Sequence, residues 1–212
     1  MLNLQAASGF TSSFAGIGKD IGEFKTEILR KSIHFLIALS PLMAAINRPF
    51  TVLFLMAGTL GYTFMEYLRL SGVKIPVISS LTSMSSRSRD MGRFVMGPVT
   101  LGFGALLALL LYPSPVASIA IYALAFGDGF ASLIGKLFGK WRPAVLCGKS
   151  VEGSFACFSA VFISAFAVSH NVNIAFIAAF TATVVEALPL EDYDNIAIPV
   201  TVGLAVQFVN FI

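Results

Sequence analysis

Seven apolar segments constrain the fold of this chain more than any other feature. Most are long enough to cross a hydrocarbon core of about 30 Å, which takes roughly 20 helical residues, and the first is short. At 57% hydrophobic and 12% charged residues, the chain lies outside the range of soluble domains, which carry about 25% charge. We therefore expect an all-α polytopic membrane protein with about seven transmembrane helices. The segments are 33–47, 49–68, 94–112, 115–135, 151–169, 171–190 and 195–212.

Charged residues fall almost entirely on one side of this expected bundle. If the chain crosses at every segment, one face holds all of the 14 Lys and Arg except Arg48. The positive-inside rule makes that face cytoplasmic. All 11 Asp and Glu lie on the same face or just inside it. Because carboxylates at membrane depth are costly and usually functional, we expect a polar reaction chamber at the cytoplasmic end.

The spans leave no room for a separate soluble domain. We predict an N-terminal arm over 1–31 and a single transmembrane catalytic bundle over 32–212. Apolar residues at helical spacing over 14–31 predict an amphipathic helix lying in the membrane interface. A basic cytoplasmic rim would attract anionic lipid head groups and nucleotide phosphates. No nucleic-acid partner is expected, and the oligomeric state is left open.

Two basic groups stand beside the membrane entry points. Arg30, Lys31 and His34 lie on one side of a helix, at spacings of three and four residues. They fit a snorkelling anchor with a capping histidine about as well as they fit a functional site. The basic loop that ends at Arg93 fits a topological signal, or a clamp on phosphate oxygens, for which guanidinium geometry is suited.

The fourth apolar segment carries an aspartate that no apolar role explains. Asp128, Ser132 and Gly135 recur at intervals of four and three residues, so one helix face offers a carboxylate, a hydroxyl and an open slot. A structural role would require a buried partner that this segment does not supply. A functional role is therefore the favoured interpretation of Asp128.

The loop before the fifth segment presents a cation, a hydroxyl and a carboxylate. Lys149, Ser150, Glu152 and Gly153 follow one another within a flexible stretch. A phosphate loop of the Walker A kind is rejected because Pro143 stands where that pattern needs Gly, and no strand precedes it. What remains is a phosphate-binding lysine, with Glu152 placed to bind metal or to orient Lys149.

Four carboxylates crowd the turn between the last two segments. Glu186, Glu191, Asp192 and Asp194 lie within nine residues, and Asn195 follows them. Such residues repel one another unless cations neutralise them, and hard oxygen ligands of this kind suit Mg²⁺. Asn195 could in addition cap the helix that begins there.

With these elements in order, the chain resembles the CTP-dependent polyprenol kinase family. That family includes dolichol, phytol and farnesol kinases and a CTP-dependent diacylglycerol kinase, with phosphatidate cytidylyltransferase more distantly similar. The matching elements are Arg30 to His34, the Gly127-Asp128 helix, Lys149 to Gly153, and Glu186 to Asn195. The resemblance implies that the terminal phosphate of CTP is transferred to a lipid alcohol, with Mg²⁺, at the cytoplasmic side of a membrane. Which alcohol is used stays open between polyprenol, phytol-like isoprenoid and diacylglycerol.

Residue chemistry and the resemblance together predict roles. Phosphoryl transfer depends mainly on positioning and on neutralising charge on the moving group. The residues expected to hold Mg²⁺ are Asp128 with one or more of Glu152, Glu186 and Asp194. The residues expected to contact nucleotide or phosphate are Arg30, Lys31, Arg93, Lys149, Ser150, Gly153 and Asn195. His34 and Asp194 both remain as acceptors of the hydroxyl proton.

Three other functions compete with this hypothesis. A cytidylyltransferase would release pyrophosphate and make an activated lipid. A small ion-coupled transporter would place acids near the bilayer centre and broken helices in matched halves, whereas here the acids cluster at one end and no repeat is present. A purely structural membrane subunit would leave the polar cluster unexplained.

Overall fold

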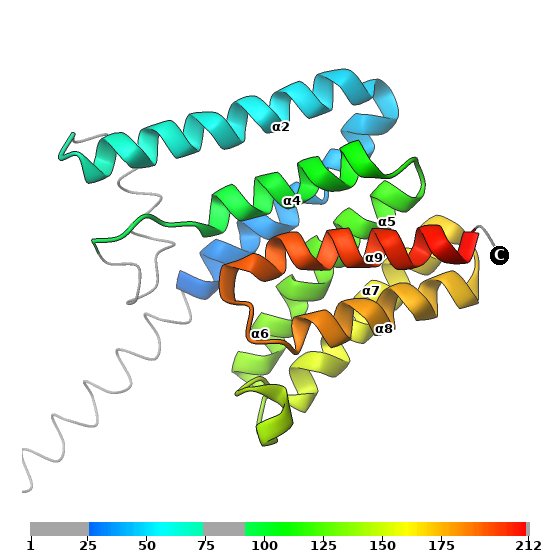
Figure 1. The fold of residues 1–212 in the computed structure, drawn as a ribbon. Helices are drawn as coiled ribbons and strands as arrows, with labels where there is room; N and C mark the ends of the chain where they lie inside the picture. Colours follow the sequence, from blue (N-terminus) through cyan, green and yellow to red (C-terminus); the bar gives the residue numbers. More distant parts are fainter. Residues whose placement is uncertain (1–25, 74–91, 211–212) are drawn as a thin grey trace, which may run out of the picture.

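The computed structural model describes residues 26–73 and 92–210, and every regular element in these ranges is a helix (Figure 1). A helical stretch over 26–37 comes first. The α-helices that follow are α2 (Ser40–Leu70), α4 (Gly97–Leu111), α5 (Val116–Tyr122), α6 (Gly129–Leu137), α7 (Val151–Ser169), α8 (Val172–Glu186) and α9 (Asp194–Asn210). Three short elements join them, namely η2 (Ala123–Asp128), η3 (Ala144–Leu146) and η4 (Glu191–Tyr193).

The first two predicted spans meet at a kink inside α2. Asn47 has φ −152° and ψ 96°, which are not helical values, and Pro49 follows it. A helix cannot continue smoothly into proline, whose ring clashes with the preceding turn and disfavours helical geometry in the residue before it. The Asn47 side chain accepts a hydrogen bond of 3.0 Å from the Phe50 N–H, which caps the second part. The predicted break at Arg48 is therefore confirmed to within one residue.

The fourth predicted segment forms one run of helix that contains a π-helical turn. α5 leads into η2, a π-helix of six residues, and η2 leads into α6. Asp128 is the last residue of η2. Short π segments within α-helices are rare and occur frequently at functional sites.

The helices pack side by side in the order α2, α4, α9, α8, α7 and α6 (Figure 1). Their contacts are made by small residues: Ala175, Ala178, Ala179 and Ala182 of α8 are all fully buried. Large apolar residues point outward instead, including Phe54 and Leu60 of α2. Small residues between helices and large apolar residues on the outside are typical of helices packed in lipid.

Among the described residues, three helices are long and apolar enough to cross a membrane, namely Ser40–Leu70, Val116–Leu137 and Val151–Ser169. Two further apolar helices, Gly97–Leu111 and Val172–Glu186, are shorter. An all-helical fold consistent with a membrane protein is therefore confirmed, whereas the count of seven spans stays a prediction. Most of the predicted interfacial helix at 14–31 lies outside the described residues.

Gly104 offers a test of the contact between α4 and α9. A Cβ atom at this position would overlap the main-chain oxygen of Asn195, whereas a Cβ atom at Gly58 would meet nothing within 4 Å. We expect Gly104→Ala to lower the free energy of unfolding by about 1–3 kcal/mol, because overpacking forces the backbones apart. The control Gly58→Ala should leave stability unchanged or raise it by about 0.5–1 kcal/mol. Thermal unfolding in detergent, followed by circular dichroism, measures both, and equal midpoints would contradict the contact.

Candidate active site

One polar cavity of about 380 Å³ brings together four parts of the chain that are far apart in sequence. Arg30 comes from the 26–37 stretch and Asp128 from the π turn. Lys149 comes from the loop before α7, and Glu186 and Asp194 come from the two sides of the last turn. The structure thus brings these acidic and basic residues together in one cavity.

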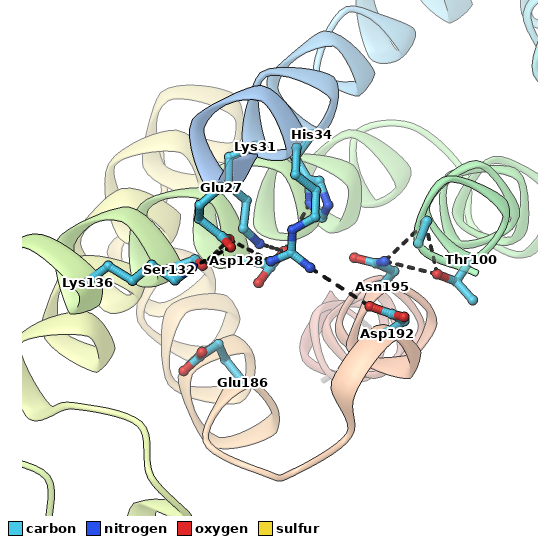
Figure 2. Close-up of polar contacts among 12 residues, drawn as sticks. Glu27, Lys31, His34, Thr100, Asp128, Ser132, Lys136, Glu186, Asp192 and Asn195 are labelled. Carbon is cyan, nitrogen blue, oxygen red and sulfur yellow. Dashed lines mark hydrogen bonds and ion pairs between the residues drawn. The ribbon is translucent and has the colours of Figure 1, made fainter. Parts of the chain in front are cut away.

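At the centre of the site lies a buried ion pair. Lys31 Nζ donates a hydrogen bond to Asp128 Oδ2, and His34 Nδ1 lies 3.0 Å from the same oxygen (Figure 2). Lys31 is only 1% exposed, and Asp128 and His34 are also buried. Asp128 lines the cavity while its two basic neighbours do not, so they hold the carboxylate from behind.

Glu27 is a central residue that the sequence reasoning missed. Its Oε1 accepts hydrogen bonds of 2.6 Å from both Arg30 and Ser132, and its Oε2 accepts one of 2.8 Å from Lys136. Burial acts to raise the pKa of Glu27, but the charges of Arg30 and Lys31, together with the hydrogen bonds from Lys136 and Ser132, outweigh it and hold that pKa well below its usual range. The signal was present, because Glu27 precedes Arg30 by three residues and Lys31 by four on one helix.

The Lys149 ammonium forms an ion pair with Glu186, with 2.8 Å between Nζ and Oε1. It also donates to the main-chain carbonyl of Glu186. The other carboxylate oxygen of Glu186 is buried and has no hydrogen-bond partner among the described residues. Glu186 therefore lines the cavity and keeps one buried carboxylate oxygen without a partner among the described residues.

The start of α7 fixes the loop that carries Lys149. The Ser150 side chain caps the helix by accepting a 3.1 Å hydrogen bond from the N–H of Gly153. A Cβ atom at Gly153 would lie 2.8 Å from the main-chain oxygen of Ala131, so only glycine lets α7 approach α6 this closely. Ser150 and Gly153 both line the cavity. Their role in the structure is to hold the Lys149 loop against α6.

The acidic turn closes the cavity from the side of α9. Asp194 begins this helix and lines the cavity. Burial raises the pKa of Asp194 to about 7, and the nearby Asp128 carboxylate adds to the effect. Arg30 NH1 lies 3.9 Å from Asp192 Oδ1, which links the turn to the 26–37 stretch (Figure 2).

Like Lys31 and His34, two further predicted site residues do not line the cavity. Glu152 is not part of the cavity wall; its Oε1 accepts hydrogen bonds of 3.0 Å from the Lys140 N–H and 3.3 Å from the Trp141 N–H. It thereby holds the loop between α6 and α7. Arg93 is exposed, and its carbonyl accepts a 3.0 Å hydrogen bond from Arg69. Neither side chain joins the cavity.

Asn195 lies between α9 and α4. Its amide donates a 2.9 Å hydrogen bond to Thr100 Oγ1, and its Oδ1 is buried without a hydrogen-bond partner in the described part of the chain (Figure 2). It is the second residue of α9 and does not line the cavity. The structure therefore gives Asn195 a contact between helices, on the side of α9 that faces α4.

No group of three or more His, Cys, Asp or Glu in the described ranges is arranged to hold a metal ion. Mg²⁺ seldom needs such a cage, because it keeps several water ligands and is bound by one or two carboxylates together with substrate phosphates. Glu186, with its unpartnered oxygen, and Asp194 fit that requirement. The carboxylates of the cavity thus fit a magnesium site of this kind.

Comparison with known proteins identifies relatives of this chain. No family model matches it, and no solved structure matches it. The chain is similar to proteins named phytol kinase. A probable chloroplastic phytol kinase of Triticum aestivum is 28% identical over 169 residues, which cover 70% of this chain and 55% of the relative. The predicted resemblance to the polyprenol kinase family is confirmed by these names.

Two further relatives have similar values. A probable phytol kinase 2 of Oryza sativa subsp. japonica is 26% identical over 199 residues, covering 85% of this chain and 65% of the relative. Phytol kinase 1 of Arabidopsis thaliana is 26% identical over 154 residues, covering 64% and 51%. All three are described as chloroplastic. The chain spans about half to two thirds of the length of these relatives.

The buried pair of Lys31 and Asp128 makes a prediction about stability. We expect Lys31→Met to lower the free energy of unfolding by about 3–5 kcal/mol, because it leaves a buried carboxylate without its counter-charge. Adding Asp128→Asn should restore much of the loss, since the double variant buries no unpaired charge. Unfolding midpoints in detergent for the two single variants and the double variant measure the coupling. Strictly additive losses would show that the two side chains do not interact.

Proposed function

We propose that this protein is a membrane-bound kinase that transfers the terminal phosphate of CTP to the hydroxyl of a lipid alcohol, with Mg²⁺. The main support for this proposal is that Asp128, the Lys149 loop and the acidic turn all line one cavity. The names of the relatives support a lipid alcohol as acceptor. CTP, Mg²⁺ and a cytoplasmic site come from the family resemblance and the charge distribution.

Basic residues of the cavity would bind the nucleotide phosphates. Arg30 presents a planar guanidinium suited to paired hydrogen bonds with phosphate oxygens. Lys149 carries three N–H donors, so it can contact a phosphate while keeping its ion pair with Glu186. In transfer reactions of this kind the protein mainly positions the groups and neutralises charge.

Acidic residues of the same cavity would hold the metal. Glu186 and Asp194 would supply oxygen ligands. Asp128 lines the same cavity, and its carboxylate is paired with Lys31. Bound Mg²⁺ would neutralise developing charge on the transferred phosphate. Lys31 and His34 act as positioning residues, because they fix the Asp128 carboxylate rather than line the cavity.

The hydroxyl of the lipid must lose its proton during transfer. Asp194 lines the cavity and would accept this proton directly, whereas His34 lies behind Asp128 and would receive it only by way of the Asp128 carboxylate. The proposal keeps both. Lipid phosphorylation by His34→Gln and Asp194→Asn, measured across a pH series, separates them, because only loss of the proton acceptor removes the acid limb of the rate profile.

Labelled CTP tests the reaction itself. Purified protein in detergent–lipid micelles, given phytol and CTP labelled at the γ-phosphate, should transfer the label to the lipid. A cytidylyltransferase would instead attach the α-labelled nucleotide to an acidic phospholipid and release the γ-label as pyrophosphate. Label that stays out of the lipid with every alcohol offered would overturn the kinase proposal.

Two substitutions test the assigned residues. We expect Lys149→Ala and Asp128→Asn each to lower kcat/KM by about 100-fold or more. The first removes the positive charge that would contact the phosphates, and the second removes the negative charge that would help to bind the metal. Lys140→Ala is the matched control, since Lys140 is exposed and does not line the cavity. Near-normal rates in a folded Asp128→Asn variant would remove the metal role of Asp128.

A further inference from the structure

An apolar groove of about 710 Å³ lies on the other side of the helix run that carries Asp128. Three stretches of the chain form this groove. Tyr122, Phe126 and Phe130 supply one wall, and Phe35 to Leu42 supply part of a second. The rest of the lining comes from one face of α7, Ala160 to Val168.

The residues that line the groove follow one another along the helix, which suits an extended hydrocarbon chain. Tyr122, Phe126 and Phe130 follow at intervals of four residues, so their rings line up along one face. Ala160 and Ala167 line the groove from α7, and because their side chains are small they leave space beside the rings. Eight residues of helix correspond to a length of about 12 Å. Apart from a serine and the tyrosine hydroxyl, all of the lining side chains are apolar.

One end of the groove lies beside the helical turn that carries Asp128. Phe126 and Phe130 lie two residues before and two residues after Asp128, and the Phe35 and Phe130 rings have centroids 5.2 Å apart. A Cβ atom at Gly129 would lie 2.8 Å from the Phe35 ring, so this ring packs on the main chain next to Asp128.

We propose that this groove binds the hydrocarbon chain of the lipid alcohol, which rests on the proposed kinase function. The hydroxyl end lies beside Phe35 and Phe130, next to the polar site. The tail runs toward Leu42 and Val168 at the far end of α7. The part of α2 that follows the kink at Asn47 is a useful contrast: its outer face is also apolar, but none of its residues lines the groove or the polar cavity.

A blocking substitution at the far end tests the assignment. In Ala167→Phe the new ring fills the tail end of the groove, so the ratio of kcat/KM for phytol to that for the shorter alcohol geraniol should fall about tenfold or more. Ala167→Leu is a milder second variant in case the first fails to fold. Ala57→Phe is the matched control, because Ala57 is exposed on α2 and does not line the groove. An unchanged ratio in folded Ala167→Phe and Ala167→Leu would overturn the groove assignment while leaving the kinase proposal intact.

A binding measurement keeps the inference separate from catalysis. A diazirine-bearing isoprenoid alcohol, photolysed with the wild-type protein, should label α7 near Ala160 and Ala167, and excess phytol should compete with it. Labelling should fall in Ala167→Phe and persist in Ala57→Phe. Labels found only on the outer face of α2, or insensitive to phytol, would overturn the groove as the binding site even if the enzyme phosphorylates lipid alcohols.

Discussion

The ion pair between Lys31 and Asp128 is the interaction on which the site depends. Both side chains are buried, and taking two charges out of water is costly unless their attraction and hydrogen bonds offset the cost. The contact joins the 26–37 stretch to the π turn of the central helix, 97 residues away. The same stretch places Glu27 within hydrogen-bond distance of Ser132 and Arg30 in the cavity wall. The ion pair therefore belongs to a set of contacts that hold the 26–37 stretch against the central helix and α6.

Sequence patterns predicted which residues meet but not how they pair. An aspartate in an apolar helix, a lysine loop and an acidic turn had to lie at one end of the bundle, and Asp128, Lys149 and Glu186 do line one cavity. The partners of each charge depend on contacts between distant segments. No local spacing shows that Lys31 binds Asp128 instead of a phosphate, or that Glu152 binds main-chain N–H groups. The same limit hid two partners of Glu27, because Ser132 and Lys136 lie more than a hundred residues away from it, although its spacing from Arg30 was visible in the sequence.

Hydropathy predicted helix positions better than helix lengths. The apolar segment at 151–169 matches α7 in full, because a capping serine and a turn at His170 bound it. The segment at 94–112 is longer than α4, since an apolar pattern continues through residues 94–96, which are not helical. Nothing in the pattern predicted that Ala123–Asp128 would form a π turn. A hydropathy pattern indicates which residues face lipid or the protein core. It carries no information on whether the hydrogen bonds within a helix are of the α or the π type.

The central helix separates two chemistries across its own width. Residues two positions apart on a helix lie on nearly opposite sides, so a carboxylate at 128 and rings at 126 and 130 must face different neighbours. Here the carboxylate meets Lys31 in the polar site, and the rings meet Phe35 and α7 in the apolar groove. A lipid alcohol has the same division, with a polar end one bond away from an apolar chain. A helix carrying both kinds of residue in adjacent turns can therefore offer an apolar surface and charged groups from its two sides.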